Sequence, residues 1–443
     1  MKKILLPFAF LALVLVASAQ SSVAKHPVLY EAASWPTWLL NDAQPIITAP
    51  PPSATVSRTE LQKVKQRVAN VTEKEKGVIR YWNAGAPSYR WNQVQLQLLA
   101  QKNEVMLRTP AAWMNLAIYD ATVLAWKEKV KYKRARPAAT DPSIKPVTAT
   151  PLTYSYPCEH TVTAAAAATV LAYFFPEKKD SIMALAREAS DSRIAAGLQY
   201  PSDAEAGWKL GESVAKQIIE KAVNDGSANK YTGFINKDPK KWTGAFPMGI
   251  TLSSFTPMVI KTADQFRPPA PPTFEKDMQE LKDFKQNFNS KFQAYYWANT
   301  GPELWNDLVS KKMFEYGIAE DAPAAARIYT VLNIAFHDMA IAVFDAKYAY
   351  WGIRPVQLDS TYKPLITTPP FPGYPSGHAA GAATSCAVLE YFFPADAAQF
   401  HQLAQDCADS RFYAGIHFRT DNETALKMGA EMGKYIVETW MKK

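Results

Sequence analysis

Cysteine is scarce in this chain: only three occur among 443 residues, at positions 158, 386 and 407. An odd, small number without any Cys-x-x-Cys pair does not indicate a disulfide framework. Cys386 and Cys407 stand among apolar residues of predicted helices, where a thiol acts as a small core side chain. The fold must therefore depend on its hydrophobic core, and a composition of 48% hydrophobic residues provides a large one.

Long apolar runs are absent beyond the N-terminus. The first 20 residues, MKKILLPFAFLALVLVASAQ, combine two lysines, an apolar run and small residues at Ala17 and Ala19. This pattern is typical of a secretory signal peptide, so we expect residues 1–19 to be cleaved and the mature protein to be periplasmic or secreted. No later segment reaches the eighteen or more apolar residues of a membrane span, which predicts none after cleavage.

Dense blocks of Lys and Arg are also lacking. The formal charge of +8 falls to +6 when Lys2 and Lys3 leave with the signal peptide. A basic balance without clustered charge argues against nucleic acid as a partner. It favours a small anion or an anionic substrate, and the alternative is a generally basic, solvated surface.

The pattern that is present is helical. Residues 20–60 are rich in Pro, Ser and Thr and predict an irregular N-terminal arm. From about residue 59 onward, apolar residues recur three and four positions apart, between Gly and Pro breaks. The sequence predicts an all-α fold.

Much of the chain repeats itself. The stretch YDATVLAWKEKVKYKRARP (119–137) aligns without gaps with HDMAIAVFDAKYAYWGIRP (337–355), which places Arg354 218 positions after Arg136 (354 − 136). The stretches YPCEH and YPSGH, and the two Asp-Ser-Arg triplets, keep the same offset. We interpret this as two related helical bundles about a pseudo-twofold axis, over residues 61–224 and 291–443, joined by a linker and lid segment over 225–290.

Only the second copy carries a complete set of reactive residues. These are Lys347, Arg354, Ser376, Gly377, His378, Arg411, His417 and Asp421. Three cations are suited to neutralising a tetrahedral oxyanion, because guanidinium groups give directional hydrogen bonds to its oxygens. Ser-Gly at a predicted helix start adds backbone N–H groups and allows close approach.

The two histidines can divide the chemistry. One would attack or ligate the central atom and the other would move a proton, because neutral imidazole is both nucleophile and base near pH 7. The i, i+4 spacing of His417 and Asp421 allows a hydrogen bond that sets the tautomer of His417.

These residues resemble the superfamily shared by type 2 phosphatidic acid phosphatases, bacterial acid phosphatases and vanadium-dependent haloperoxidases, which is helical and binds phosphate or vanadate in one pocket. The resemblance implies that His417 is the vanadate ligand or phosphate nucleophile, His378 the acid–base partner, and Asp421 the residue that orients His417. The oxyanion-binding residues would be Lys347, Arg354, Ser376, Gly377 and Arg411.

Segments such as FDAKYAYWGIRPV and HFRTD are similar to the haloperoxidase-like branch. Phe371 would then border the halide pocket. This branch implies a vanadate cofactor, with hydrogen peroxide and a halide as substrates. The alternative is a phosphatase that hydrolyses a phosphate ester through a phosphohistidine, without a cofactor. A third alternative, a non-catalytic oxyanion binder, does not need the histidine pair.

The first copy departs from this pattern. Glu159 takes the place of Gly377 and Gln199 the place of His417. A carboxylate repels an anion, and an amide can neither attack nor titrate. We therefore expect a degenerate pocket that keeps a packing role, with residual anion binding around Lys129, Arg136 and Arg193 as an open alternative.

Overall fold

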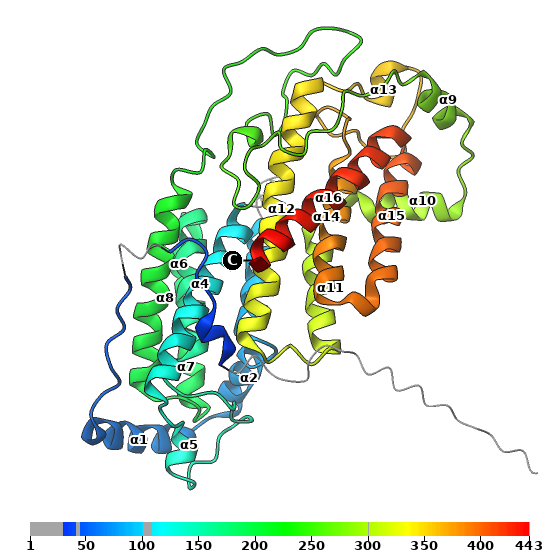
Figure 1. Cartoon of the computed structure of the whole chain (residues 1–443). Helices are drawn as coiled ribbons and strands as arrows, with labels where there is room; N and C mark the ends of the chain where they lie inside the picture. Colours follow the sequence, from blue (N-terminus) through cyan, green and yellow to red (C-terminus); the bar gives the residue numbers. More distant parts are fainter. Residues whose placement is uncertain (1–29, 41–44, 101–108, 300, 443) are drawn as a thin grey trace, which may run out of the picture.

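The computed structural model describes residues 30–40, 45–100, 109–299 and 301–442 (Figure 1). The expected signal peptide lies outside these ranges. Within them the regular elements are α-helices and short 3-10 helices, with no strand, which confirms the predicted all-α fold.

The helices follow one another in two similar series. The first comprises η1 (Glu31–Ser34), α1 (Ala54–Ala69), α2 (Glu73–Trp82), α3 (Pro87–Ala100), α4 (Thr109–Tyr132), α5 (Pro137–Thr140), α6 (Glu159–Phe174), η2 (Pro176–Lys178), α7 (Lys179–Ala195) and α8 (Pro201–Ala222). The second comprises η3 (Leu252–Ser254), α9 (Glu275–Asp283), α10 (Phe288–Tyr296), η4 (Trp297–Asn299), α11 (Pro302–Glu315), α12 (Ala322–Tyr350), α13 (Pro355–Leu358), α14 (Gly377–Phe392), η5 (Pro394–Asp396), α15 (Ala397–Tyr413) and α16 (Arg419–Lys442).

Equivalent helices of the two series start at a constant separation. The first residues of α6 and α14 are 218 apart (377 − 159), as are those of α7 and α15 (397 − 179) and of α8 and α16 (419 − 201). In Figure 1 the two groups of helices lie side by side, with α12 between them. The helix boundaries thus follow the repeat seen in the sequence, and the common ancestry of the two halves stays a prediction.

Each half also has its own extended arm. In the first half, the buried Asp120 carboxylate accepts hydrogen bonds from the backbone N–H groups of Trp38 and Leu39 at 2.6 and 3.0 Å. In the second half, Asp338 accepts from the N–H groups of Met258, Val259 and Ile260 at 2.8 to 2.9 Å. Residues near 258–260 therefore form the arm of the second half, where the sequence suggested only a linker.

Two expected boundaries differ in detail. Helix α1 begins at Ala54 behind the N-cap Ser53, inside the range expected to be irregular. Helix α9 and the first turn of α10 fall within the expected linker, 225–290. Helices α1 and α9 are both amphipathic and both follow Pro-rich stretches. Prolines are typical of irregular segments, so they hid the helical spacing of the apolar residues.

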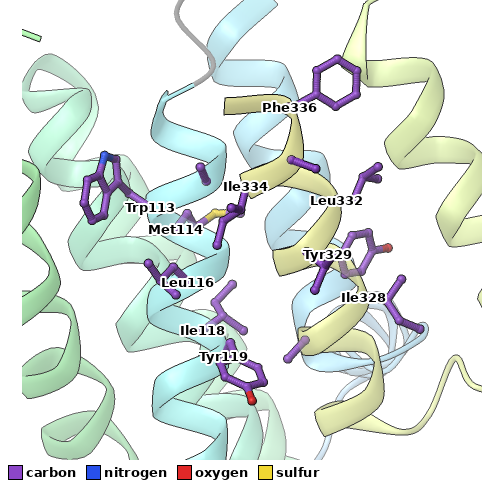
Figure 2. Close-up of a cluster of buried hydrophobic side chains, with 14 of the residues drawn as sticks. Trp113, Met114, Leu116, Ile118, Tyr119, Ile328, Tyr329, Leu332, Ile334 and Phe336 are labelled. Carbon is purple, nitrogen blue, oxygen red and sulfur yellow. The ribbon is translucent and has the colours of Figure 1, made fainter. Parts of the chain in front are cut away.

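The two halves meet through helices α4 and α12. Figure 2 shows Met114 of α4 beside Ile334 of α12, while Trp113 and Phe336 of the same buried cluster point away from this contact on opposite sides. Other helices cover α4 and α12 on nearly all sides, which explains why apolar residues occupy nearly every face of both helices. Across the contact, the Thr330 hydroxyl donates to the Asn115 carbonyl at 2.8 Å.

Within the part of the chain that the structure describes, one helical stretch is apolar and long enough to cross a membrane by length and composition. It spans Ala322–Leu358, and 89% of its apolar window is buried inside the protein. Its central position in Figure 1 and its contacts with α4 and α14 explain this apolar character as that of a core helix.

Candidate functional site

Helix ends bring the predicted site residues of the second half together. Lys347 lies in the last turn of α12, where Trp351 adopts a left-handed conformation (φ 53°) and ends the helix. Arg354 directly precedes α13. Ser376 caps α14 by accepting from the Ala379 N–H at 3.5 Å. The remaining residues come from the end of α15 and the start of α16: Arg411, His417 and Asp421.

These side chains are almost entirely removed from solvent. Lys347, Arg354, Ser376 and Asp421 are 0% exposed, and Arg411 and His417 are 1% and 2% exposed. Burial lowers the pKa of the Arg354 and Arg411 guanidinium groups to about 10, which reflects the cost of burying a cation without sufficient counter-charge.

The imidazole of His417 lies within the field of all the other cationic groups. Burial first, and then the positive charges of Arg354, Lys347, His378 and Arg411, hold its pKa well below the ordinary value. The predicted site residues therefore converge on His417, and this imidazole is neutral near pH 7.

Hydrogen bonds define the tautomer of His417. The Arg354 Nη1 atom lies 2.9 Å from His417 Nε2, and guanidinium can only donate, so Nε2 carries a lone pair. The other ring nitrogen, Nδ1, then donates to Asp421 Oδ2 at 2.9 Å. The expected orientation of His417 by Asp421 matches this geometry, and Nε2 is the nitrogen able to ligate or attack.

Backbone carbonyls hold two of the cations in place. Lys347 Nζ donates to the carbonyls of Pro372 and Gly373 at 2.7 and 2.9 Å. Arg354 donates through Nε to the Phe371 carbonyl at 3.0 Å and through Nη1 to the Ile416 carbonyl at 2.7 Å. Its remaining nitrogen, Nη2, is buried and has no hydrogen-bond partner among the residues that the structure describes.

The charges within this cluster do not balance. Three buried cations, Lys347, Arg354 and Arg411, face one carboxylate that hydrogen-bonds within the cluster, Asp421; the other buried carboxylate nearby, Asp277, is bound by Thr420. Burial raises the pKa of Asp421 and lowers that of Lys347, and the attraction between the two groups opposes both shifts. An anion that accepted from Arg354 Nη2 would supply the missing charge and hydrogen bond, so a tetrahedral oxyanion fits this residue set.

Space at the start of α14 is consistent with such a ligand. Apart from its chain neighbours and its own helix backbone, a Cβ atom placed on Gly377 would meet a single described atom within 4 Å, Val343 Cγ1 at 3.9 Å. No protein side chain therefore requires a glycine there. The next residue, His378, is partly exposed, unlike His417, and so lies between the buried cluster and solvent.

Phe371 forms an apolar wall beside the cations. Its ring packs edge-on against Phe344 at 5.4 Å between centroids, and Lys347 Nζ and the Arg354 guanidinium each lie 5.1 Å from its centroid. This places Phe371 at the cluster, as the halide-pocket assignment requires, and the assignment itself stays a prediction.

The first half holds its cations in the same way. Lys129 Nζ donates to the Tyr154 carbonyl at 2.6 Å, and Arg136 donates through Nε to the Thr153 carbonyl and through Nη1 to the Leu198 carbonyl. These acceptors are the counterparts of Pro372, Phe371 and Ile416 at an offset of 218.

A carboxylate of the protein itself fills this first pocket. Glu159 accepts from Lys129 Nζ and Arg136 Nη2, each at 2.8 Å, and from Gln199 Nε2 at 3.2 Å. Burial would raise the pKa of Glu159, but Arg136 and Lys129 hold it well below its usual range. Residual anion binding around Lys129 and Arg136 is thus opposed by an anion that the chain already provides.

One neighbour of the site was missed from the sequence. Tyr348, one residue after Lys347, interacts electrostatically with Arg354 and donates to the Met248 carbonyl at 2.5 Å. The Met248 N–H in turn donates to the Pro370 carbonyl at 3.0 Å, so residues near 248 lie against the segment that leads to Phe371. In the sequence, the only indication that Tyr348 belongs to the site was the aromatic run that follows Lys347. Such a run is equally typical of core packing.

Comparisons with known proteins bear on the family and the fold. Residues 110–224 match the PAP2 superfamily, and residues 397–443 match the VCPO second helical-bundle domain. Among curated proteins, none matches the chain in sequence.

Solved structures share the fold at low sequence identity. A bacterial vanadium-dependent iodoperoxidase is 18% identical with a TM-score of 0.57, over 88% of this chain and 98% of its own. The apo form of a bacterial vanadium-dependent chloroperoxidase is 16% identical with a TM-score of 0.59, over 77% of this chain and 94% of its own. These similarities establish the fold, which is the one expected from the motifs.

Proposed function

We propose that this member of the PAP2 superfamily, which has the fold of vanadium-dependent haloperoxidases, is an exported enzyme that oxidises halide with hydrogen peroxide at a vanadate held by His417. The observation that carries the proposal is the charge imbalance of the second half. Three buried cations and an unpartnered Arg354 Nη2 surround a neutral imidazole whose Nε2 has a lone pair.

Each residue of the cluster has a defined part in this proposal. His417 Nε2 would ligate the oxyanion, which requires Arg354 Nη1 to turn from the imidazole towards an oxygen. Lys347, Arg354 and Arg411 would neutralise the oxygens, and Asp421 would keep Nδ1 protonated. Bound vanadate would act as a Lewis acid that activates the peroxide towards the halide.

His378 would move the proton. It belongs to the first turn of α14, its charge affects the pKa of His417, and it is partly exposed. A histidine between a buried pocket and solvent can take a proton from incoming peroxide and return it to a leaving oxygen.

A second candidate function is hydrolysis of phosphate esters. It is considered because residues 110–224, in the first half, match the PAP2 superfamily, and because phosphate has nearly the same shape and charge as vanadate. In this reaction His417 Nε2 would attack phosphorus, and His378 would protonate the leaving alcohol. The haloperoxidase assignment is preferred because this chain aligns with 98% of the length of a bacterial iodoperoxidase.

Paired assays test the proposal. Purified protein, with and without orthovanadate, would be assayed for oxidation of iodide, bromide and chloride by peroxide, and for hydrolysis of a chromogenic phosphate ester. We expect vanadate-dependent halide oxidation that His417→Ala removes. Ester hydrolysis without any vanadate-dependent oxidation would reject the haloperoxidase in favour of the phosphatase.

A further inference from the structure

The hairpin formed by α14 and α15 carries a second group of reactive side chains, away from the oxyanion cluster. Cys386 Sγ, a carboxylate oxygen of Glu390 and a ring nitrogen of His401 all lie within 4.8 Å of one another. Cys386 is buried, Glu390 is partly exposed and His401 is exposed. The group therefore has a solvent-facing side.

The local structure orients these ligand atoms. Cys386 and Glu390 are four residues apart on α14, which places them on one face of that helix. His401 comes from the second turn of α15, which packs against α14. His401 Nε2 lies 3.0 Å from Glu390 Oε2, so these two side chains are already turned towards each other.

The first half shows that packing does not require these residues. At the offset of 218, the counterparts of Cys386, Glu390 and His401 are Ala168, Ala172 and Met183. The same hairpin is thus built there from apolar side chains. Three ligand types appear together only in the half that carries the oxyanion cluster.

We propose that Cys386, Glu390 and His401 bind a zinc ion, with water as the fourth ligand. Thiolate, imidazole and carboxylate are the zinc donors of proteins, and a thiolate disfavours magnesium and calcium. Ligand atoms around tetrahedral zinc lie about 3 to 4 Å apart, given metal–ligand bonds of about 2.0 to 2.3 Å. Small side-chain rotations would close the observed group to this size, and binding would release the Cys386 thiol proton to solvent.

The place of this site in the fold assigns it a supporting role. Cys386 lies eight residues after His378, which is about 12 Å along the helix. Zinc would tie α14 to α15 near their connection, and the opposite ends of the same helices carry Ser376 and Arg411. The ion would stabilise the scaffold of the oxyanion site and stay outside its reaction.

Zinc titration of the full chain tests this proposal. Protein stripped with a chelator under reducing conditions would be titrated with zinc chloride by calorimetry and followed by thermal unfolding. The variants Cys386→Ala, Glu390→Ala and His401→Met introduce the residues of the first half, so they should fold. Gln402→Ala, which changes an exposed neighbour, serves as the matched control.

We expect one zinc ion per wild-type chain and a raised unfolding temperature, with both effects lost in Cys386→Ala and His401→Met and kept in Gln402→Ala. Cobalt should give a thiolate charge-transfer absorption that Cys386→Ala removes. Zinc binding that survives in both Cys386→Ala and His401→Met, or no binding by the wild-type chain, would overturn the proposal. Parallel titration of His417→Ala, expected to bind zinc as the wild type does, separates this site from the oxyanion cluster.

Discussion

In each half of the molecule, a Lys and an Arg side chain donate hydrogen bonds to equivalent backbone carbonyls. The two halves neutralise these positive charges in different ways. In the first half, the Glu159 carboxylate forms salt bridges with Lys129 and Arg136, and the three side chains make a closed ion cluster. In the second half, Gly377 takes that position and leaves Arg354 Nη2 without a partner. The same frame therefore holds a closed ion cluster in the first half and, in our proposal, an anion in the second, where Gly377 takes the place of Glu159 and His417 that of Gln199.

The largest expected effect concerns the imidazole that has no counterpart in the first half. His417→Ala should lower either activity by at least about 10³-fold, because it removes the ligand or nucleophile. Gln199→Ala, at the equivalent position, should leave activity unchanged. Steady-state kinetics of both variants, with thermal unfolding as the folding control, would check this. Similar losses of activity in both variants would contradict the assignment of the chemistry to the second half alone.

Gly377→Glu should convert the second pocket into a copy of the first. The new carboxylate would pair with Lys347 and Arg354, so activity should fall by at least about 10²-fold because oxyanion binding is blocked. Stability should stay equal or rise by about 1 to 3 kcal/mol, since buried cations gain a partner. Kinetics and chemical denaturation would measure both, and an active Gly377→Glu enzyme would refute the assigned anion position.

The reverse change, Glu159→Gly, should destabilise the protein. It leaves Lys129 and Arg136 buried without their carboxylate, at a cost of about 3 to 5 kcal/mol. Added phosphate should recover part of this loss by occupying the vacated position, whereas chloride at equal ionic strength should not. Denaturation curves in each salt would show it, and an unchanged free energy of unfolding would contradict the ion-cluster role.

The smallest effect is the pH dependence that Glu159 gives to stability. Its pKa is lowered in the folded protein, so its contribution is complete above the unfolded value of 4.5 and is lost as pH falls towards the folded value. Glu159→Gln should therefore flatten the decline of stability in acid below about pH 5. Unfolding midpoints of both proteins between pH 7 and pH 3 would test this, and parallel curves would argue against it.

Much of the candidate site was predictable because it follows local rules. The spacing of Lys347, Arg354 and His378 repeats that of Lys129, Arg136 and His160, and the roles assigned to them rest on the family resemblance and stay predictions. The i, i+4 relation of His417 and Asp421 correctly suggested their hydrogen bond. Helical periodicity likewise sufficed for the fold class.

Other features depend on contacts between distant segments. Nothing local indicates that Asp338 binds the backbone of residues 258–260, although its alignment with Asp120 offered a hint. The pairing of Arg354 Nη1 with His417 Nε2 joins residues 63 positions apart. Cys386 was expected to be a core residue, and its proximity to His401 arises only when α14 packs on α15.

The most direct test of the central claim is the number of oxyanions bound per chain. Calorimetric titration with orthovanadate, and separately with phosphate, would be performed on the wild type, Gly377→Glu and Gln199→Ala. We expect one site per chain in the wild type and in Gln199→Ala, and none in Gly377→Glu. Two sites per chain, or a site that persists in Gly377→Glu, would contradict it.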